Sequence, residues 1–177
     1  MPRLLLMRHA KSDWDHAGLA DIDRPLNKRG RRNATEMGGW LVEQGAVPDL
    51  ILVSPACRAQ ETIVLLTAEF GHSKPEVRTC EGLYPCSPQA IAQSIATVSD
   101  TLETILIAAH NPAMEIVVDM IGGRAEHFPT GAVADVEVVG RTWLAAVADS
   151  VGFFSHCELR QIWRPRTLFE DNDAKKR

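Results

Sequence analysis

Leu4-Leu5-Leu6-Met7-Arg8-His9-Ala10-Lys11-Ser12 is the stretch of sequence that decides the fold. It starts with four apolar residues that show no helical periodicity, which is typical of a strand buried on both faces. The apolar run ends at Arg8 and His9, a cation beside an imidazole, and the chain then becomes polar. Since ligands of an open α/β sheet bind beyond the carboxyl ends of its strands, we expect an α/β fold with a binding site at this point.

Two further apolar runs, over Leu50–Val53 and Thr104–Ala109, predict buried strands with similar ends. Ser54-Pro55 follows the first run and His110 follows the second. A helix expected over residues 56–70 carries Arg58 in its first turn, where a cation opposes the helix dipole and makes more sense beside a bound anion. The carboxyl ends of parallel strands meet at one edge of a sheet. Four side chains are therefore expected to surround one volume: Arg8, His9, Arg58 and His110.

The rest of the chain predicts helices between the strands and more strands near the C-terminus. Helical spacing of apolar residues predicts helices over residues 31–44, 88–98 and 113–121. Ser54-Pro55 and Ser87-Pro88 are each expected to supply an N-cap and a first helical residue. Further strands are predicted over residues 132–138, half exposed because apolar and polar residues alternate, and over 142–147 and 158–163. Residues 11–29 are expected to form a long charged loop and residues 77–88 an irregular segment.

The composition is that of an ordinary globular domain. With 177 residues, 45% hydrophobic and 24% charged, we expect a single domain over residues 1–169 and a disordered polar tail over residues 170–177. The net charge of −4 gives no electrostatic case for nucleic-acid binding, and no apolar run is long enough for a membrane span or a signal peptide. The four cysteines form no CxxC pair. We therefore expect free thiols and a cytoplasmic protein with no nucleic-acid or membrane partner.

Two arginines and two histidines around one volume suit a tetrahedral oxyanion, because guanidinium groups match phosphate oxygens. Neighbouring arginines disfavour a protonated imidazole, so one histidine is expected to be neutral near pH 7. A neutral imidazole facing a bound phosphoryl group is a nucleophile, which predicts phosphoryl transfer through a phosphohistidine intermediate. Motifs of other phosphate chemistries do not occur: there is no Cys-x5-Arg, no GxxxxGK loop and no pair of histidines at helical metal-ligand spacing.

Arg8-His9-Ala10 after an apolar strand resembles the RHG signature of the histidine phosphatase superfamily, which has the phosphoglycerate-mutase-like fold. Several segments are similar to the short bacterial SixA-type phosphohistidine phosphatases; they are residues 6–12, 23–30, 54–62, 110–112 and 128–132. The resemblance runs over residues 4–168. It implies a three-layer α/β/α sandwich with a mixed, mostly parallel central sheet, and it implies no metal and no organic cofactor.

The resemblance also implies roles for individual residues. His9 would be the phosphorylated nucleophile. The residues that hold the phosphoryl oxygens would be Arg8, Arg58 and His110. Ser12 and Arg24 would lie close to the pocket.

The identity of the general acid stays open between three carboxylates. Glu81 lies where larger members of the superfamily carry a catalytic glutamate, but the residues after it do not match their motif. Asp13 and Asp15 are the alternatives. A protonated imidazole is an easier leaving group than an alkoxide, so a phosphohistidine substrate would demand less of any acid.

We therefore expect a metal-independent phosphatase that hydrolyses a phosphoryl group from a protein histidine. Its partner would be a phosphorylated protein, such as a histidine-phosphotransfer domain. One alternative is a phosphomonoesterase that acts on a small phosphate ester with the same residues. The other is a non-catalytic phospho-binding module, although pure binding requires the arginines and not two histidines.

Overall fold

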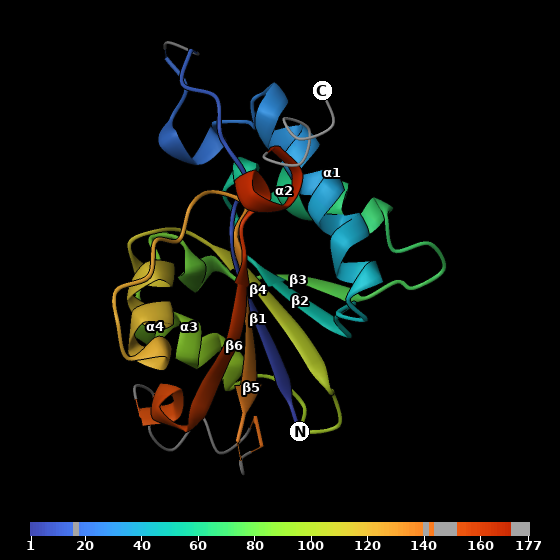
Figure 1. Ribbon diagram of the computed structural model, residues 1–177. Helices are drawn as coiled ribbons and strands as arrows, with labels where there is room; N and C mark the ends of the chain where they lie inside the picture. The colour runs from blue at the N-terminus through green and yellow to red at the C-terminus, as the bar shows by residue number, and fades with distance from the viewer. Residues whose placement is uncertain (16–17, 140–141, 144–151, 171–177) are drawn as a thin grey trace.

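The computed structural model describes residues 1–15, 18–139, 142–143 and 152–170. Within these ranges one sheet has six strands in the order β3-β2-β4-β1-β5-β6 (Figure 1). The strands are β1 (Arg3–Arg8), β2 (Leu50–Val53), β3 (Glu76–Thr79), β4 (Thr104–Ala109), β5 (Val133–Val138) and β6 (Cys157–Trp163). The first four run parallel, whereas β5 is antiparallel to β1 and β6 is antiparallel to β5. The predicted mixed, mostly parallel sheet is confirmed.

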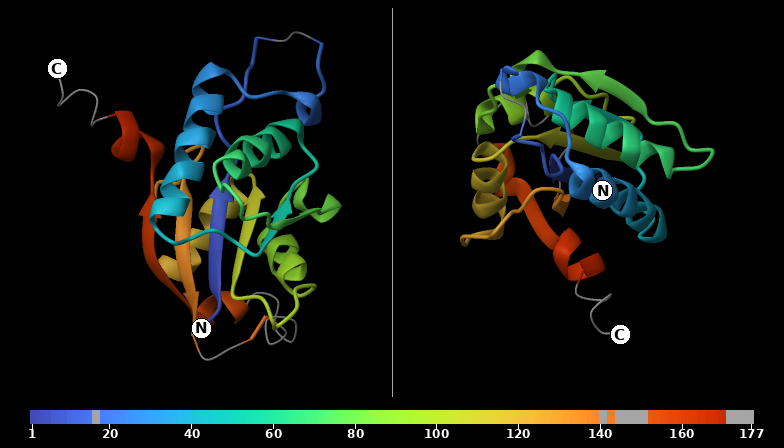
Figure 2. Two further views of the ribbon diagram at one scale, coloured as in Figure 1. Left: turned by 90° about the vertical axis from the view of Figure 1, so that its right-hand side faces the viewer. Right: turned by 90° about the horizontal axis from the view of Figure 1, so that it is seen from above.

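Helices cover both faces of this sheet and complete the three predicted layers. Figures 1 and 2 show α1 (Lys28–Glu43) and α2 (Cys57–Ala68) on one face, with α3 (Pro88–Ile95) and α4 (Ala113–Gly122) on the other. Successive side chains of a strand point to opposite faces. In β1, Leu5 and Met7 pack in the core with residues of α1 and α2, while Leu4 and Leu6 pack with residues of α3 and α4. All four are fully buried, so the run is apolar throughout.

The strand register brings the predicted residues to one edge of the sheet. Arg8 at the end of β1 is level with Ala109 at the end of β4, and Val53 at the end of β2 is level with Ala108. The backbone N–H of His9 continues this pairing by donating to the Ala109 carbonyl at 3.1 Å. Three chain segments therefore leave the sheet side by side, and the residues after each strand face a common space.

Two predictions for the middle of the chain are wrong. Residues 77–88 are not all irregular, because β3 pairs with β2 and Glu81–Leu83 form a 3₁₀ helix. All four β3 side chains are exposed at the sheet edge, so the strand has no apolar pattern. Ser54 is also not the N-cap of α2: the N-cap is Ala56, with no side-chain hydrogen bond. The predicted cap at Ser87 is confirmed, since its side chain accepts from the N–H of Ala90.

The C-terminal part differs from the prediction in the burial of β5. Its residues are buried apart from a half-buried Glu137, because β6 covers its edge and its acidic side chains form ion pairs. Asp135 pairs with Arg3 at 2.8 Å and Glu137 pairs with Arg160. Apart from Thr142 and Trp143, which are not in a strand, the strand predicted over residues 142–147 lies outside the described residues. Of the disordered tail predicted over residues 170–177, Glu170 is the last residue of a π-helix over Arg166–Glu170, and residues 171–177 lie outside the described residues. In the described ranges, no helix is long and apolar enough to cross a membrane.

Candidate active site

A cavity of about 270 Å³ lies beyond the carboxyl ends of β1, β2 and β4. It is lined by Arg8, His9, Lys11, Ser12, Trp14, Asp21, Arg24, Arg58, His110, Asn111 and Thr130. Six of the seven site residues proposed from the sequence are therefore brought together, and Glu81 is not among them. The described parts of the segment after β1, residues 11–15 and 18–29, lie at this end of the sheet (Figure 2). They contain a 3₁₀ helix, Asp21–Asp23, and an isolated bridge between Ser12 and Leu26.

The imidazole of His9 is held in one orientation by the backbone. Its Nδ1 lies 2.7 Å from the carbonyl oxygen of Ala10. A carbonyl oxygen only accepts, so Nδ1 carries the proton and Nε2 keeps its lone pair. The guanidinium of Arg58 donates from Nε to this Nε2 at 3.3 Å. The nitrogen without a proton is thus the one that faces a cationic side chain.

Both imidazoles are neutral at physiological pH, and burial is the main reason. Burial lowers the pKa of His9 to about 3, with smaller lowering effects from His110, Arg58 and Arg8. Burial likewise lowers the pKa of His110 to about 4, with a contribution from Arg58. The sequence predicted a neutral histidine from the arginine charges alone. The charge state agrees, but desolvation causes more of the shift than the arginines do.

His110 presents one nitrogen to the site and is fixed by the other. Its Nε2 lies 2.7 Å from Ser54 Oγ, and Ser54 Oγ also accepts from the N–H of Ala56 at 3.3 Å. The Ser54 hydroxyl proton is then free to point at Nε2, which leaves the ring proton on Nδ1. In the described part of the chain Nδ1 is buried with no hydrogen-bond partner. It is a donor that a phosphoryl oxygen would satisfy.

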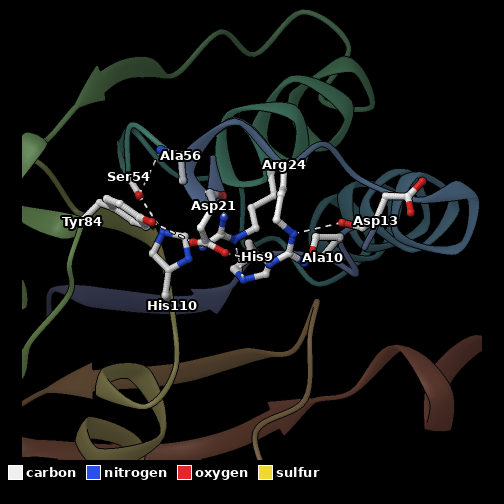
Figure 3. A network of polar contacts seen from close by, with 11 residues as sticks. His9, Ala10, Asp13, Asp21, Arg24, Ser54, Ala56, Tyr84 and His110 are labelled. Carbon is white, nitrogen blue, oxygen red and sulfur yellow. Dashed lines mark hydrogen bonds and ion pairs between the residues drawn. The ribbon is translucent and has the colours of Figure 1, made fainter. Parts of the chain in front are cut away.

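The arginines are held by a carboxylate that the sequence analysis did not single out. Asp21 accepts from Arg58 at 3.0 Å and from Arg24 at 2.8 Å, and the Tyr84 hydroxyl donates to it at 2.7 Å (Figure 3). The Tyr84 hydrogen bond and the two arginines lower the Asp21 pKa to about 2, and in turn Asp21 raises the pKa of Tyr84. Arg24 also donates to Ser12 Oγ at 2.6 Å. Asp21 therefore fixes two guanidinium groups at the cavity.

Comparison with known proteins agrees with this geometry. Residues 4–87 match the model of the histidine phosphatase superfamily (branch 1). An uncharacterised protein of Mycobacterium tuberculosis is 38% identical over 145 residues, which cover 76% of this chain and 88% of the relative. An uncharacterised chloroplastic protein of Arabidopsis thaliana is 32% identical over 154 residues, 82% of this chain and 71% of that protein. The chain belongs to the histidine phosphatase superfamily.

Among solved structures, this chain is similar to SixA-type proteins. A protein of Agrobacterium tumefaciens that is provisionally assigned as the phosphohistidine phosphatase SixA superposes with a TM-score of 0.75 at 26% identity, covering 92% of this chain and 98% of the other. The protein histidine phosphatase SixA in complex with tungstate superposes with a TM-score of 0.77 at 21% identity, covering 94% of this chain and 99% of the other. At that identity the second match supports the fold alone. The expected resemblance to SixA-type proteins is confirmed.

None of the three carboxylates considered as general acid lines the cavity at the ends of β1, β2 and β4. Glu81 is exposed in the 3₁₀ helix after β3, and Asp15 is exposed as well. Asp13 contributes its carbonyl to Arg24 at 3.0 Å, while its carboxylate accepts from the N–H of Asp15. Asp21 is the one carboxylate that lines the cavity among the described residues. In the same ranges no three acidic, histidine or cysteine side chains gather in a way that could hold a metal ion.

Proposed function

We propose that this protein is a metal-independent phosphohistidine phosphatase that forms a covalent intermediate on His9. The observation that carries the proposal is the His9 ring: Nδ1 donates to the Ala10 carbonyl, so Nε2 carries the lone pair, which lies in a cavity with arginines and accepts a 3.3 Å hydrogen bond from Arg58 Nε. A neutral imidazole in that position is a nucleophile toward phosphorus. Arg8, Arg58 and the Nδ1–H of His110 supply donors for the phosphoryl oxygens, which are where charge must be stabilised in this reaction.

The reaction then has two steps. His9 Nε2 attacks the phosphorus atom, and the new N–P bond forms as the bond to the leaving group breaks. Water then attacks the phosphohistidine, releases inorganic phosphate and restores the lone pair on Nε2. Arg8 and Arg58 hold the same oxygens in both steps, so positively charged side chains supply the electrostatic stabilisation without a metal ion.

The protonation states in the cavity favour a protein phosphohistidine over an alkyl phosphate. An alkoxide leaving group needs a proton from an acid, whereas a substrate imidazole can leave with less help. Asp21, the carboxylate that lines the cavity, has a pKa of about 2 and is therefore ionised at neutral pH. Free cysteines at positions 57, 80, 86 and 157 fit a cytoplasmic location, where such a partner protein would be met.

The decisive experiment compares wild type with His9→Ala in EDTA. Substrates are a histidine-phosphotransfer domain phosphorylated on histidine, an aryl phosphate and a small metabolic phosphate ester. We expect wild type to prefer the phosphoprotein, and His9→Ala to lose at least about a thousandfold in kcat/KM. His72→Ala is the matched control, because His72 is exposed and outside the cavity. Rapid quenching with labelled substrate should trap label on wild type and His72→Ala and not on His9→Ala.

Each other outcome assigns the protein differently. Activity on the small ester alone would keep His9 as the nucleophile and replace the protein substrate with a metabolite. Phosphate binding without turnover, unchanged in His9→Ala, would make the protein a phospho-binding module. Activity that EDTA abolishes would contradict the metal-independent mechanism.

A further inference from the structure

A second cavity lies beside the active-site cavity. Its volume is about 340 Å³, and Lys11 and Thr130 line both cavities. Its other walls come from α1, from residues 127–130 and from the segment after β6, which packs on α1 through Phe169 against Trp40. The basic side chains and the amide that line it are those of Lys11, Arg29, Asn33, His127, Arg164 and Arg166. We call this space the basic cavity.

Close backbone packing builds the walls of the basic cavity. At Gly30, an added Cβ would lie 2.1 Å from the carbonyl oxygen of Lys11, so α1 approaches the segment after β1 as closely as a glycine permits. Gly131 has φ +78°, and a Cβ there would lie 3.1 Å from Pro165. Arg164 Nε donates to the His127 carbonyl at 3.0 Å. The three walls are thus fixed against one another by the fold.

The charged side chains that line the basic cavity are all positive, although the whole chain has a net charge of −4. No aspartate or glutamate is among the described residues that line it. Glu126, nearby, pairs with Arg164 at 2.9 Å and also with Arg124. Lys11 and Arg166 are exposed and form no ion pair within the described ranges. Guanidinium groups converging on a concave space suit a carboxylate or a phosphate.

A buried amide supplies an independent sign that the basic cavity takes a polar ligand. Asn33 is only 5% exposed, yet in the described part of the chain its Oδ1 is buried with no hydrogen-bond partner. Buried polar atoms in folded proteins nearly always have a partner. The unpartnered atom is an acceptor, so its partner is a donor such as a ligand hydroxyl or the water that bridges to an anion, while the amide NH₂ of the same side chain can donate to the anion itself.

We propose that the basic cavity binds a second anionic group of the substrate while the phosphoryl group occupies the active-site cavity. The proposal rests on the phosphatase function above and adds a specificity determinant to it. Because Lys11 and Thr130 line both, the two cavities are adjacent, which is the arrangement that an extended ligand with two anionic groups requires. For a protein substrate the second group is an acidic side chain close to the phosphohistidine. For a small substrate it is a second phosphate or a carboxylate of the same molecule.

The test uses Arg166→Glu, which reverses a charge in the basic cavity. Arg78→Glu is the matched control, because Arg78 is an exposed arginine on β3 that lines neither cavity. Two phosphohistidine peptides are compared that differ only in having aspartates or asparagines beside the phosphohistidine. We expect Arg166→Glu to lower kcat/KM about tenfold for the acidic peptide, the loss typical of one charge-assisted hydrogen bond. The loss should stay below about twofold for the neutral peptide and for phenyl phosphate, since neither has a second anion.

A second variant and a second pair of substrates separate the sources of the anion. Asn33→Leu removes the amide. It should lower kcat/KM for the acidic peptide and leave kcat/KM for the neutral peptide nearly unchanged. A metabolite bisphosphate is compared with its monophosphate on the same variants. A selective loss on the bisphosphate but not on the acidic peptide would assign the second anion to a small ester and overturn the protein source.

The failure of this inference differs from the failure of the proposed function. If wild type hydrolyses both peptides equally well and Arg166→Glu retains that activity, the basic cavity has no role in specificity. If wild type hydrolyses no phosphohistidine substrate at all, the proposed function itself is wrong. Circular dichroism on each variant shows whether the chain is folded. Unchanged activity on phenyl phosphate shows in addition that the active-site cavity is intact.

Discussion

Ser54 illustrates how a single hydroxyl can decide the chemistry of its neighbour. Its Oγ accepts from the N–H of Ala56 and lies 2.7 Å from His110 Nε2, where donation of its hydroxyl proton keeps the His110 ring proton on Nδ1. We expect Ser54→Ala to lower kcat/KM about tenfold or more, because His110 loses both its orientation and its preferred tautomer. Ser87→Ala removes a different hydroxyl, the N-cap of α3, and should cost about 1 kcal/mol of stability with no loss of kcat. Equal kcat/KM for wild type and Ser54→Ala would contradict the positioning role.

The two buried imidazoles make the folded protein sensitive to acid. Their pKa values are lowered to about 3 for His9 and about 4 for His110, against about 6.5 in an unfolded chain. Between these values the unfolded chain binds more protons, so stability is complete above pH about 6.5 and falls as the pH falls. From pH 6.5 to 5 each histidine should remove about 2 kcal/mol of unfolding free energy.

Urea unfolding at a series of pH values measures this dependence. His9→Gln should show about half of the loss that wild type shows between pH 6.5 and 5, because one of its two buried imidazoles is gone. His72→Gln, at an exposed position, should follow wild type. A wild-type stability that stays flat over this range would mean that the histidines are not buried as neutral groups.

At the scale of elements, the contact between α1 and the segment after β1 sets the shape of both cavities. Gly30→Ala places a Cβ about where the Lys11 carbonyl oxygen lies, so the segment must shift. We expect a loss of more than about 2 kcal/mol of stability and a lower kcat/KM, since Ser12 and Arg24 are attached to the same segment. Gly39→Ala, in the same helix with no atom within 4 Å, should instead stabilise by up to about 1 kcal/mol. Thermal unfolding and steady-state kinetics of the two variants provide the comparison.

The strands show which elements a sequence can reveal. β2 and β4 are predicted to the residue, because a strand buried on both faces is a continuous apolar run. β3 has no such signal, because it is an exposed edge strand held by backbone pairing with β2. β5 gives a misleading signal: its acidic residues resemble an exposed face but are partnered by Arg3 and Arg160. Only the fold brings those arginines to it.

For the whole molecule, the predictable part of the site is the part fixed by strand ends. Arg8, His9 and His110 follow apolar runs, and parallel register brings them together. Asp21 and Tyr84, by contrast, are 63 residues apart and meet only through the folding of two irregular segments. No local pattern marks such a pair, and the role of Ser54 as partner of His110 is hidden for the same reason.

A site assembled from such distant segments exists only in the folded chain, so a ligand that binds it should stabilise the entire molecule. At 100 times its dissociation constant, inorganic phosphate should add about 2.7 kcal/mol to the unfolding free energy. For a domain of this size that raises Tm by about 5 to 10 °C. Sodium chloride at matched ionic strength is the control, and an equal shift with chloride would mean that phosphate has no specific site.

The Asp21 carboxylate should limit this stabilisation, because it occupies donors of Arg58 and Arg24 and repels an incoming anion. Asp21→Asn should therefore bind phosphate more tightly and show a larger Tm shift at the same phosphate concentration. Asp23→Asn removes the same charge from an exposed position in the same 3₁₀ helix and should behave as wild type. Weaker phosphate binding by Asp21→Asn would show instead that Asp21 acts mainly by orienting the two guanidinium groups toward the phosphoryl oxygens.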